Sequence, residues 1–259
     1  MRLKDKSAII TGASRGIGEA AARIFVREGA RVTIADIDQD RGQALAAELG
    51  EAATFHKLDV ANPADWQALV AATTECFGGI DALVNNAGIY KTAPIVETSP
   101  EMFEQMFRIN QLGPFLGMQA VIPAMQKRGG GVILNLSSTS GLKGNQFSIA
   151  YGSTKWAVRG MSKIAAVELG EYNIRVNSIH PGLIDTPMNQ EHMGNDRIVS
   201  GGEATPLRRH GEASEIAEVL AFLCSDAASY CSGGEYTVDG AVSAGTLRVR
   251  FQPKAADDE

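Results

Sequence analysis

Tyr151 and Lys155 are the residues whose types and spacing point most directly to chemistry. They stand four residues apart in a segment, residues 149–157, whose composition is typical of the start of a helix. At that spacing both side chains project from one face of a helix. A nearby ammonium favours phenolate, so we expect Lys155 to lower the pKa of Tyr151 from about 10 toward neutral pH. The pair is also typical of an ordinary solvated helix face, so its meaning depends on its surroundings.

The overall composition is typical of a globular protein and speaks against several kinds of partner and location. The chain has 259 residues, of which 44% are hydrophobic and 21% charged, which suits one α/β domain. A net charge of −6 speaks against nucleic acid as a partner and gives no sign of an anionic membrane surface. The N-terminus lacks the apolar core of a signal peptide, and no run reaches the roughly 20 apolar residues of a membrane span. We therefore expect a cytoplasmic protein.

Cysteine and histidine positions give no indication of a metal site. The three cysteines and four histidines show neither the spacing of zinc ligands nor that of a disulfide framework. We predict no metal and a reducing compartment. His180, which precedes a proline, is interpreted as a packed or hydrogen-bonded residue rather than as a base.

A glycine-rich turn near the N-terminus is the first candidate for a cofactor site. It follows an expected strand at residues 7–11 and opens a helix, with the spacing Thr11-Gly12-x-x-x-Gly16-x-Gly18. Glycines let the backbone come close to a pyrophosphate, and the N-terminus of a helix favours its negative charge. A tight turn without a ligand would carry the same glycines.

Asp36 supports the interpretation of the turn as a nucleotide site. It ends the second expected strand, residues 31–36, where a carboxylate accepts hydrogen bonds from both ribose hydroxyls of a dinucleotide. Because a carboxylate repels a 2′-phosphate, Asp36 predicts NAD rather than NADP. Alone, it would be interpreted as a solvated acid at a strand end. Arg15 in the turn could bind a 2′-phosphate or pair with surface acids. We therefore base the prediction of NAD rather than NADP on Asp36.

The remaining pattern alternates short apolar runs with helical segments. Strands that are apolar throughout predict a parallel sheet covered on both faces. Gly113-Pro114 should bend a long helix that runs from about residue 99 to 125. Residues 187–209 contain several glycines and prolines, and we expect an irregular, mobile lid over a site. We assign one domain to residues 1–245 and a polar tail to residues 246–259. The expected strands are residues 7–11, 31–36, 53–60, 81–88, 131–138, 175–180 and 234–240.

Taken together, the motifs resemble those of the short-chain dehydrogenases/reductases, over nearly the whole chain. The resemblance rests on their order: Thr11-Gly12-x-x-x-Gly16-x-Gly18, Asp59-Val60, Asn85-Asn86-Ala87-Gly88, Asn110, Ser138, Tyr151-x-x-x-Lys155 and Pro181-Gly182. It implies a doubly wound, mostly parallel, seven-stranded Rossmann-type α/β fold. The chemistry of the glycine turn and the resemblance together predict which residues contact NAD. They are Gly12, Ser14, Arg15, Gly16, Ile17, Gly18, Asp36, Ile37, Asp59, Val60, Asn86, Ala87, Gly88, Tyr151, Lys155, Pro181, Gly182, Ile184, Thr186 and Met188.

Four residues are expected to carry the reaction. Ser138 ends a strand at the carboxyl edge of the sheet, where it can hold a substrate oxygen, and Tyr151 can act on that oxygen as general acid/base. The resemblance assigns Lys155 to the nicotinamide ribose and Asn110 to a proton-relay water. Ser137 is an equally good serine by composition, and only register favours Ser138. Asn110 could instead simply cap a bent helix.

The substrate is less well defined by the sequence. The segment around Tyr151 resembles bacterial hydroxysteroid dehydrogenases, whose members are NAD-linked homotetramers. A hydrophobic secondary alcohol or ketone is therefore favoured, with a steroid as the first guess. Reductases of acyl-carrier thioesters and non-catalytic dinucleotide-binding regulators are the alternatives; the first is disfavoured by Asp36 and the acidic balance, the second by the intact catalytic set. The candidate substrate residues are Ser138, Leu142, Phe147, Tyr151, Met188 and Met193.

Overall fold

One parallel sheet organises the part of the chain that the computed structural model describes, residues 1–245, in which the side chains of Met193 and Arg197 are not described. The predicted tail, residues 246–259, lies outside the described residues. The strand order is β3-β2-β1-β4-β5-β6-β9, and every neighbouring pair is parallel. The predicted fold class is therefore confirmed. The strands are β1 (Ser7–Thr11), β2 (Arg31–Asp36), β3 (Ala53–Lys57), β4 (Ala82–Asn85), β5 (Gly131–Leu136), β6 (Ile174–Pro181) and β9 (Glu235–Val238).

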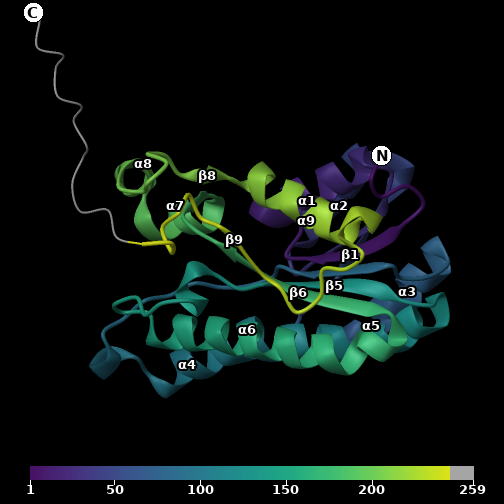
Figure 1. Ribbon diagram of the computed structural model, residues 1–259, viewed down its shortest axis with the longest axis horizontal. Helices are drawn as coiled ribbons and strands as arrows, with labels where there is room; N and C mark the ends of the chain where they lie inside the picture. The colour runs from purple at the N-terminus through teal and green to yellow at the C-terminus, as the bar shows by residue number, and fades with distance from the viewer. Residues whose placement is uncertain (246–259) are drawn as a thin grey trace, which may run out of the picture.

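Helices cover both faces of the sheet (Figure 1). On one side lie α1, α2 and α9, and on the other α3, α5 and α6. The helices are α1 (Gly16–Arg27), α2 (Gln39–Leu49), α3 (Pro63–Phe77), α4 (Pro100–Phe107), α5 (Gly113–Arg128), α6 (Ile149–Leu169), α7 (Pro187–Met193), α8 (Asn195–Glu203) and α9 (Ala213–Cys224). Short 3-10 turns lie at Gly50–Ala52, Ile95–Glu97, Thr139–Gly141, Gly170–Tyr172 and Asp226–Ala228.

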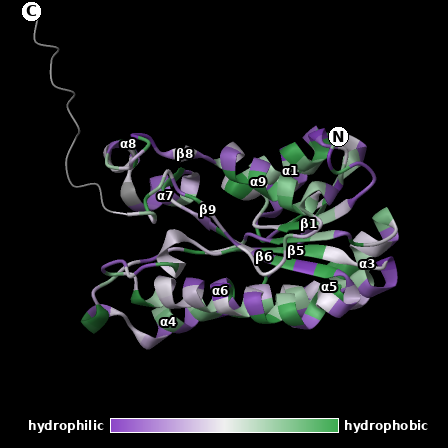
Figure 2. Cartoon of the chain, in the orientation of Figure 1, coloured by the Kyte–Doolittle hydropathy of each residue, from purple (hydrophilic) through white to green (hydrophobic). Residues whose placement is uncertain are grey.

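The apolar strands explain why the sheet is buried on both faces. Successive side chains of a strand point to opposite faces. Ile9 packs with α3 and α5, whereas Ile10 packs with α1 and α9, and both are fully buried. Figure 2 shows that hydrophobic residues dominate the strands between the two helical layers. Two cores on one sheet follow from this pattern.

Strand order reverses between β1 and β4, and this reversal positions the site. From β1 the chain proceeds outward to β2 and β3, then returns to β4 on the other side of β1. Loops after β1 and β4 therefore leave in opposite directions, and a crevice opens at their carboxyl ends. The third strand ends at Lys57, earlier than predicted, because residues 58–60 leave the sheet to line that crevice.

The helix expected across Asn110 is interrupted by a π turn, Arg108–Leu112, between α4 and α5. The Gly113 N–H donates to the carbonyl of Arg108, five residues back. Pro114 has no N–H to offer, so the regular pattern cannot continue through it. The irregularity that Gly113-Pro114 predicts is present, and it places Asn110 in its centre.

The lid segment differs from its prediction. Residues 187–209 were expected to be irregular, yet α7 and α8 occupy most of them. Thr186 caps α7 by accepting a bond from the Asn189 N–H at 3.4 Å. Pro187 then occupies the first turn, where its missing N–H costs nothing. A two-stranded sheet, β7 (Ile184–Asp185) with β8 (Gly211–Glu212), closes the segment at its base.

Trp66 ties α3 to the crevice. The indole is 1% exposed, and its N–H donates to the Val60 carbonyl at 2.9 Å. Gly117 on α5 lies against the ring, and a Cβ added there would be 2.6 Å from it. The turn that carries Val60 is thus fixed directly to the core.

Among the residues that the structure describes, no helix combines the length and the apolarity that crossing a membrane would require.

Candidate active site

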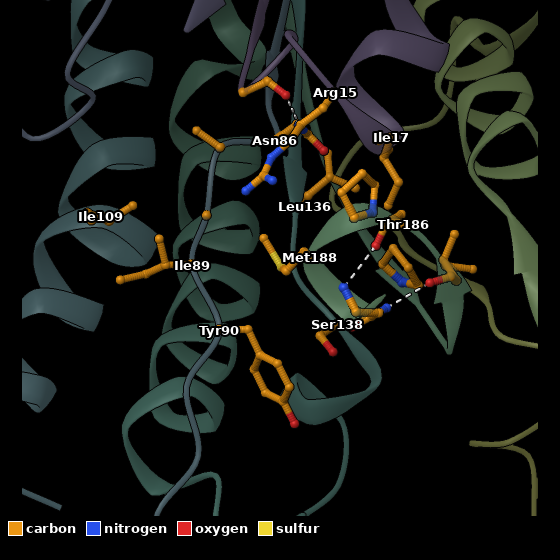
Figure 3. A pocket seen from close by; sticks show the side chains of 18 of the residues that line it. Arg15, Ile17, Asn86, Ile89, Tyr90, Ile109, Leu136, Ser138, Thr186 and Met188 are labelled. Carbon is orange, nitrogen blue, oxygen red and sulfur yellow. Dashed lines mark hydrogen bonds between the residues drawn. The ribbon is translucent and has the colours of Figure 1, made fainter. Parts of the chain in front are cut away.

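A cavity of about 710 Å³ opens at the carboxyl ends of the strands. Its walls come from the carboxyl ends of β1, β2, β4, β5 and β6 with the loops that follow them, from residues 58–60 after β3, and from the starts of α6 and α7. In Figure 3, Arg15 and Asn86 lie toward one end of this cavity, Ser138 and Tyr90 toward the other, and Met188 between them. We call the end with Arg15 the ribose end, because Asp36 is predicted to bind ribose hydroxyls there, and the end with Ser138 the catalytic end.

The glycine turn needs its glycines for close approach. Gly12 has φ of +61°, and a Cβ there would lie 2.7 Å from the Ala87 backbone. A Cβ on Gly18 would lie 2.2 Å from the Gly12 carbonyl oxygen, which no side chain could tolerate. Gly18 therefore serves the packing of helix against turn, and it is not among the residues that line the cavity.

Thr11 and Asn86 hold the turn against β4. The Thr11 hydroxyl accepts bonds from the backbone N–H groups of Asn86 and Ala87, both at 3.0 Å. The Asn86 amide donates to the carbonyls of Thr11 at 2.9 Å and Gly12 at 3.0 Å. These four bonds fix the loops after β1 and β4 to each other at the point where the strand order reverses.

Asp36 faces the ribose end and already accepts two backbone bonds. Its Oδ2 accepts from the Ser14 N–H at 2.9 Å, and its Oδ1 from the Asp38 N–H at 3.0 Å. A carboxylate has about four acceptor sites, so capacity remains for two ribose hydroxyls. Arg41, beside it in the cavity wall, lies 3.5 Å from the Asp38 carboxylate.

Ser137 and Ser138 point in different directions. The Ser137 hydroxyl donates to the Lys155 carbonyl at 2.9 Å and is buried against α6. The Ser138 hydroxyl accepts from the Ser140 N–H at 3.1 Å and interacts with the Tyr151 hydroxyl. The geometry therefore favours Ser138 over Ser137 as the serine that faces a substrate.

His180 supports Ser138 from behind. The buried ring lies between two oxygens, with Nδ1 3.1 Å from the Ser138 carbonyl and Nε2 2.9 Å from the Ser178 hydroxyl. Burial lowers the pKa of His180, which favours a neutral ring. His180 is thus the packed, hydrogen-bonded residue that its place in the sequence predicts.

Tyr151 does not have the lowered pKa that the sequence predicts. Burial raises the pKa of Tyr151 to about 12, and the hydrogen bond with Ser138 only partly opposes this shift. Desolvation destabilises the charged phenolate more than the neutral phenol. The spacing of Tyr151 and Lys155 does not reveal how deeply the helix face is buried, so it could not predict this rise in pKa.

Lys155 is 5% exposed, and its Nζ donates to the Leu136 carbonyl at 2.8 Å. The ammonium also lies 5.6 Å from the centre of the Tyr151 ring. Burial lowers the pKa of Lys155 to about 8. Of these two buried groups, only Lys155 exchanges its proton near working pH, whereas the phenol of Tyr151 stays neutral there.

Asn110 joins the π turn to the loop after β4. Its Oδ1 accepts from the Ile89 N–H at 2.8 Å, and its Nδ2 donates to the Ile89 carbonyl at 2.9 Å. The side chain is fully buried, and both of its polar atoms bond the backbone of another loop. Its predicted part in a proton relay stays a prediction.

Most predicted site residues gather around the cavity. Gly18, Asn110, Leu142 and Phe147 are not among the lining residues; Phe147 is 50% exposed with φ of +64°. Met193 ends α7, but its side chain lies outside the described part of the chain. The predicted residues that line the cavity are Gly12, Ser14, Arg15, Gly16, Ile17, Asp36, Ile37, Asp59, Val60, Asn86, Ala87, Gly88, Ser138, Tyr151, Lys155, Pro181, Gly182, Ile184, Thr186 and Met188.

Tyr90 also lines the cavity, although no motif in the sequence singles it out. The Tyr90 ring packs edge-on against Tyr151, with centroids 4.6 Å apart, and against His192 of α7 at 4.4 Å. Tyr90 directly follows Asn-Asn-Ala-Gly-Ile at the carboxyl end of β4, and that position was a usable signal. Asn145 lines the cavity too, and it lies in the segment 141–147, which the sequence predicts as part of the substrate pocket.

The residues present fit a dinucleotide. The glycine turn leaves the approach that a pyrophosphate needs, and any Cβ at Gly12 would meet the Ala87 backbone. Asp36 at one end offers acceptors for ribose hydroxyls, and Lys155 at the other end offers an ammonium. No cluster of three or more metal-binding side chains is found within the described residues.

Comparison with known proteins agrees with this geometry. Residues 12–243 match the family model described as enoyl-(acyl carrier protein) reductase. A 3-alpha-(or 20-beta)-hydroxysteroid dehydrogenase of Mycobacterium tuberculosis is 42% identical over 96% of this chain and 94% of its own length. A trans-4-hydroxycyclohexanecarboxylate dehydrogenase of Sinomonas cyclohexanicum is 40% identical over 94% of this chain and 95% of its own. A crystal structure of 3-ketoacyl-(acyl-carrier-protein) reductase from Brucella melitensis, complexed with NADH, superposes with a TM-score of 0.89 at 35% identity, covering 93% of this chain and 99% of that one.

Proposed function

The chain belongs to the short-chain dehydrogenase/reductase family, and we propose that it transfers a hydride between NAD(H) and a hydrophobic secondary alcohol or ketone. The family uses NAD(P), and an oxidoreductase acting on secondary alcohols or ketones follows from membership. The observation that carries the finer proposal is the cavity itself, with Asp36 at one end and Ser138, Tyr151 and Lys155 at the other.

The nicotinamide of the bound cofactor supplies the hydride chemistry. The protein's own part is to hold the substrate oxygen and to move one proton. Ser138 is placed to donate to that oxygen, and Tyr151 gives it a proton in reduction or takes one in oxidation. Lys155 holds a positive charge behind the ring of Tyr151, and the Leu136 carbonyl keeps it there.

A cyclic alcohol or ketone is the class that we propose for the substrate, with a hydroxysteroid as the leading member. Ile89, Tyr90 and Met188 add hydrophobic side chains to the cavity wall, and Tyr90 packs against Tyr151. Flat or ring-shaped apolar groups pack well against such a surface. Two relatives named above act, by their names, on hydroxysteroids and on a hydroxylated cyclohexane ring, which supports this class.

NAD is proposed as the cofactor because of Asp36. A carboxylate that faces the ribose repels a 2′-phosphate and accepts from free hydroxyls. The Brucella relative, crystallised with NADH, supports this preference.

Reduction of an acyl-carrier thioester is the second candidate, because the matching family model and the Brucella relative carry such names. The net charge of −6 disfavours docking of an acidic carrier protein.

We further propose a cytoplasmic homotetramer. Large apolar side chains are exposed on the helices that cover one face of the sheet, and such surfaces mark contacts between subunits. They are Phe103, Phe107, Phe115, Trp156, Ile164 and Val167.

The experiment that tests the function is a substrate panel. Secondary alcohols, including 3- and 20-hydroxysteroids, cyclohexanols and a 3-hydroxyacyl thioester, are assayed with NAD and with NADP by the appearance of reduced cofactor. We expect the highest kcat/KM for a cyclic alcohol with NAD. Activity confined to the thioester would favour the second candidate, and an absence of reduced cofactor with every alcohol would contradict both.

A further inference from the structure

Arg15 and Glu191 form an ion pair that joins the glycine turn to the lid. Nη1 of Arg15 lies 2.5 Å from Oε1 of Glu191 on α7. Arg15 lines the cavity, and so do residues 187–189 at the start of the same helix. The pair therefore connects two walls of the cavity that are 176 residues apart in the chain.

The position of Arg15 in the cavity indicates what the ion pair with Glu191 does. Figure 3 shows Arg15 at the ribose end of the cavity, and the backbone N–H of its neighbour Ser14 donates to Asp36. A guanidinium is the side chain best suited to bind a phosphate, through two parallel hydrogen bonds. Arg41, the other arginine of this wall, is already held 3.5 Å from Asp38.

We propose that Glu191 is a second selectivity residue for the cofactor, acting with Asp36 against NADP. Glu191 neutralises Arg15 and so withholds from a 2′-phosphate the cation that would bind it. The inference rests on the proposed function, since it assumes that a dinucleotide occupies this cavity. In this proposal, cofactor selectivity depends on two carboxylates, that of Asp36 on β2 and that of Glu191 on α7.

The size of the effect follows from exposure. The side chains of Arg15 and Glu191 are 41% and 62% exposed, so solvent screens their attraction. The pair can be broken at little cost, and its influence on selectivity should be a few-fold rather than absolute. Such an influence is visible only when the two cofactors are compared directly.

Binding of NADH and NADPH, measured by fluorescence titration at low ionic strength, tests this inference without turnover. Glu191→Gln should tighten NADPH binding about threefold to fivefold while NADH binding changes less than about twofold. Glu203→Gln removes the same charge from α8, where the backbone carbonyl, not the carboxylate, accepts from Arg208. This matched control should leave both affinities unchanged.

The Arg15→Ala background identifies the cause. If Glu191 acts by holding Arg15, Glu191→Gln should have no effect on NADPH binding once Arg15 is removed. An equal gain in that background, or an equal gain with Glu203→Gln, would show a general charge effect and overturn the inference. Unchanged NADPH affinity in Glu191→Gln would overturn it too. Wild-type protein that prefers NADPH would instead contradict the proposed NAD preference, while the ratio between variants would still decide the role of Glu191.

Discussion

At the ribose end of the cavity, charges lie in partly exposed pairs, whereas at the catalytic end the ammonium of Lys155 is buried. Glu191 is 62% exposed beside Arg15, but Lys155 is 5% exposed and bonds a backbone carbonyl. Water and salt screen the first arrangement and barely reach the second. The charges at the ribose end should therefore change the relative affinities for NAD and NADP by small factors.

The catalytic end works on a different principle. Burial moves the pKa of Tyr151 up to about 12 and that of Lys155 down to about 8. Such shifts arise only where charge is costly, and they set which proton can move. Changes at this end should therefore alter the rate of reaction, while changes at the ribose end should alter the choice of cofactor.

Tyr151→Phe should produce the largest effect. Removing the hydroxyl removes the proton donor and acceptor, so we expect kcat to fall about a thousandfold or more. The ring, and with it the packing against Tyr90, is retained. Steady-state kinetics measure the loss, and a fluorescence titration should find NADH affinity within about twofold of wild type. Turnover close to wild type would remove Tyr151 from its assigned role.

The pH dependence should separate the two directions of reaction. Oxidation needs the phenolate of Tyr151, and because its pKa is about 12 the phenolate fraction grows throughout the neutral range. The oxidation rate should rise by up to about tenfold per pH unit from about pH 6 to 8. Reduction needs the phenol, which is fully present there, so its rate should stay level.

Loss of the Lys155 proton sets the upper end of that window, because its pKa is about 8. The measurement is the hydride-transfer step in single-turnover experiments, with a deuterated alcohol to confirm that transfer is being observed. An oxidation step that does not change with pH would contradict proton transfer by Tyr151.

Asp36→Ala should have the smallest of these effects, and it should fall on selectivity. The carboxylate that repels a 2′-phosphate is lost, so the preference for NAD, expressed as a ratio of kcat/KM values, should drop by about tenfold. The kcat with saturating NAD should change little, because Asp36 lies at the far end of the cavity. A large loss of kcat with an unchanged cofactor ratio would show that the two ends are not separate in function.

How far the sequence predicts this molecule depends on whether a residue acts through the backbone or through its surroundings. Gly12 and the strand that precedes it could be placed because their constraints are local. Ile9 and Ile10 predict a sheet buried on both faces, and each indeed packs on its own core. The fold followed from such local patterns, repeated along the chain.

The parts that were missed depend on contacts between distant segments. The pKa of Tyr151 is governed by burial that a helical pattern does not reveal. Glu191 meets Arg15 only because α7 lies across the cavity, and no spacing in the sequence records that contact. Glycines and Pro187 predict an irregular lid, but Pro187 follows the cap Thr186 and starts a helix.

The bond between Trp66 and Val60 gives the molecule an optical reporter of its own. The indole is buried, and its N–H donates to the carbonyl of Val60, which lines the cavity. Emission from a buried indole responds to small changes in the polarity around it. The other tryptophan, Trp156, is 46% exposed on α6 and belongs to the surface that we propose as a subunit contact. Binding at the ribose end should therefore alter the emission of Trp66, and it can be followed by light without attaching any label.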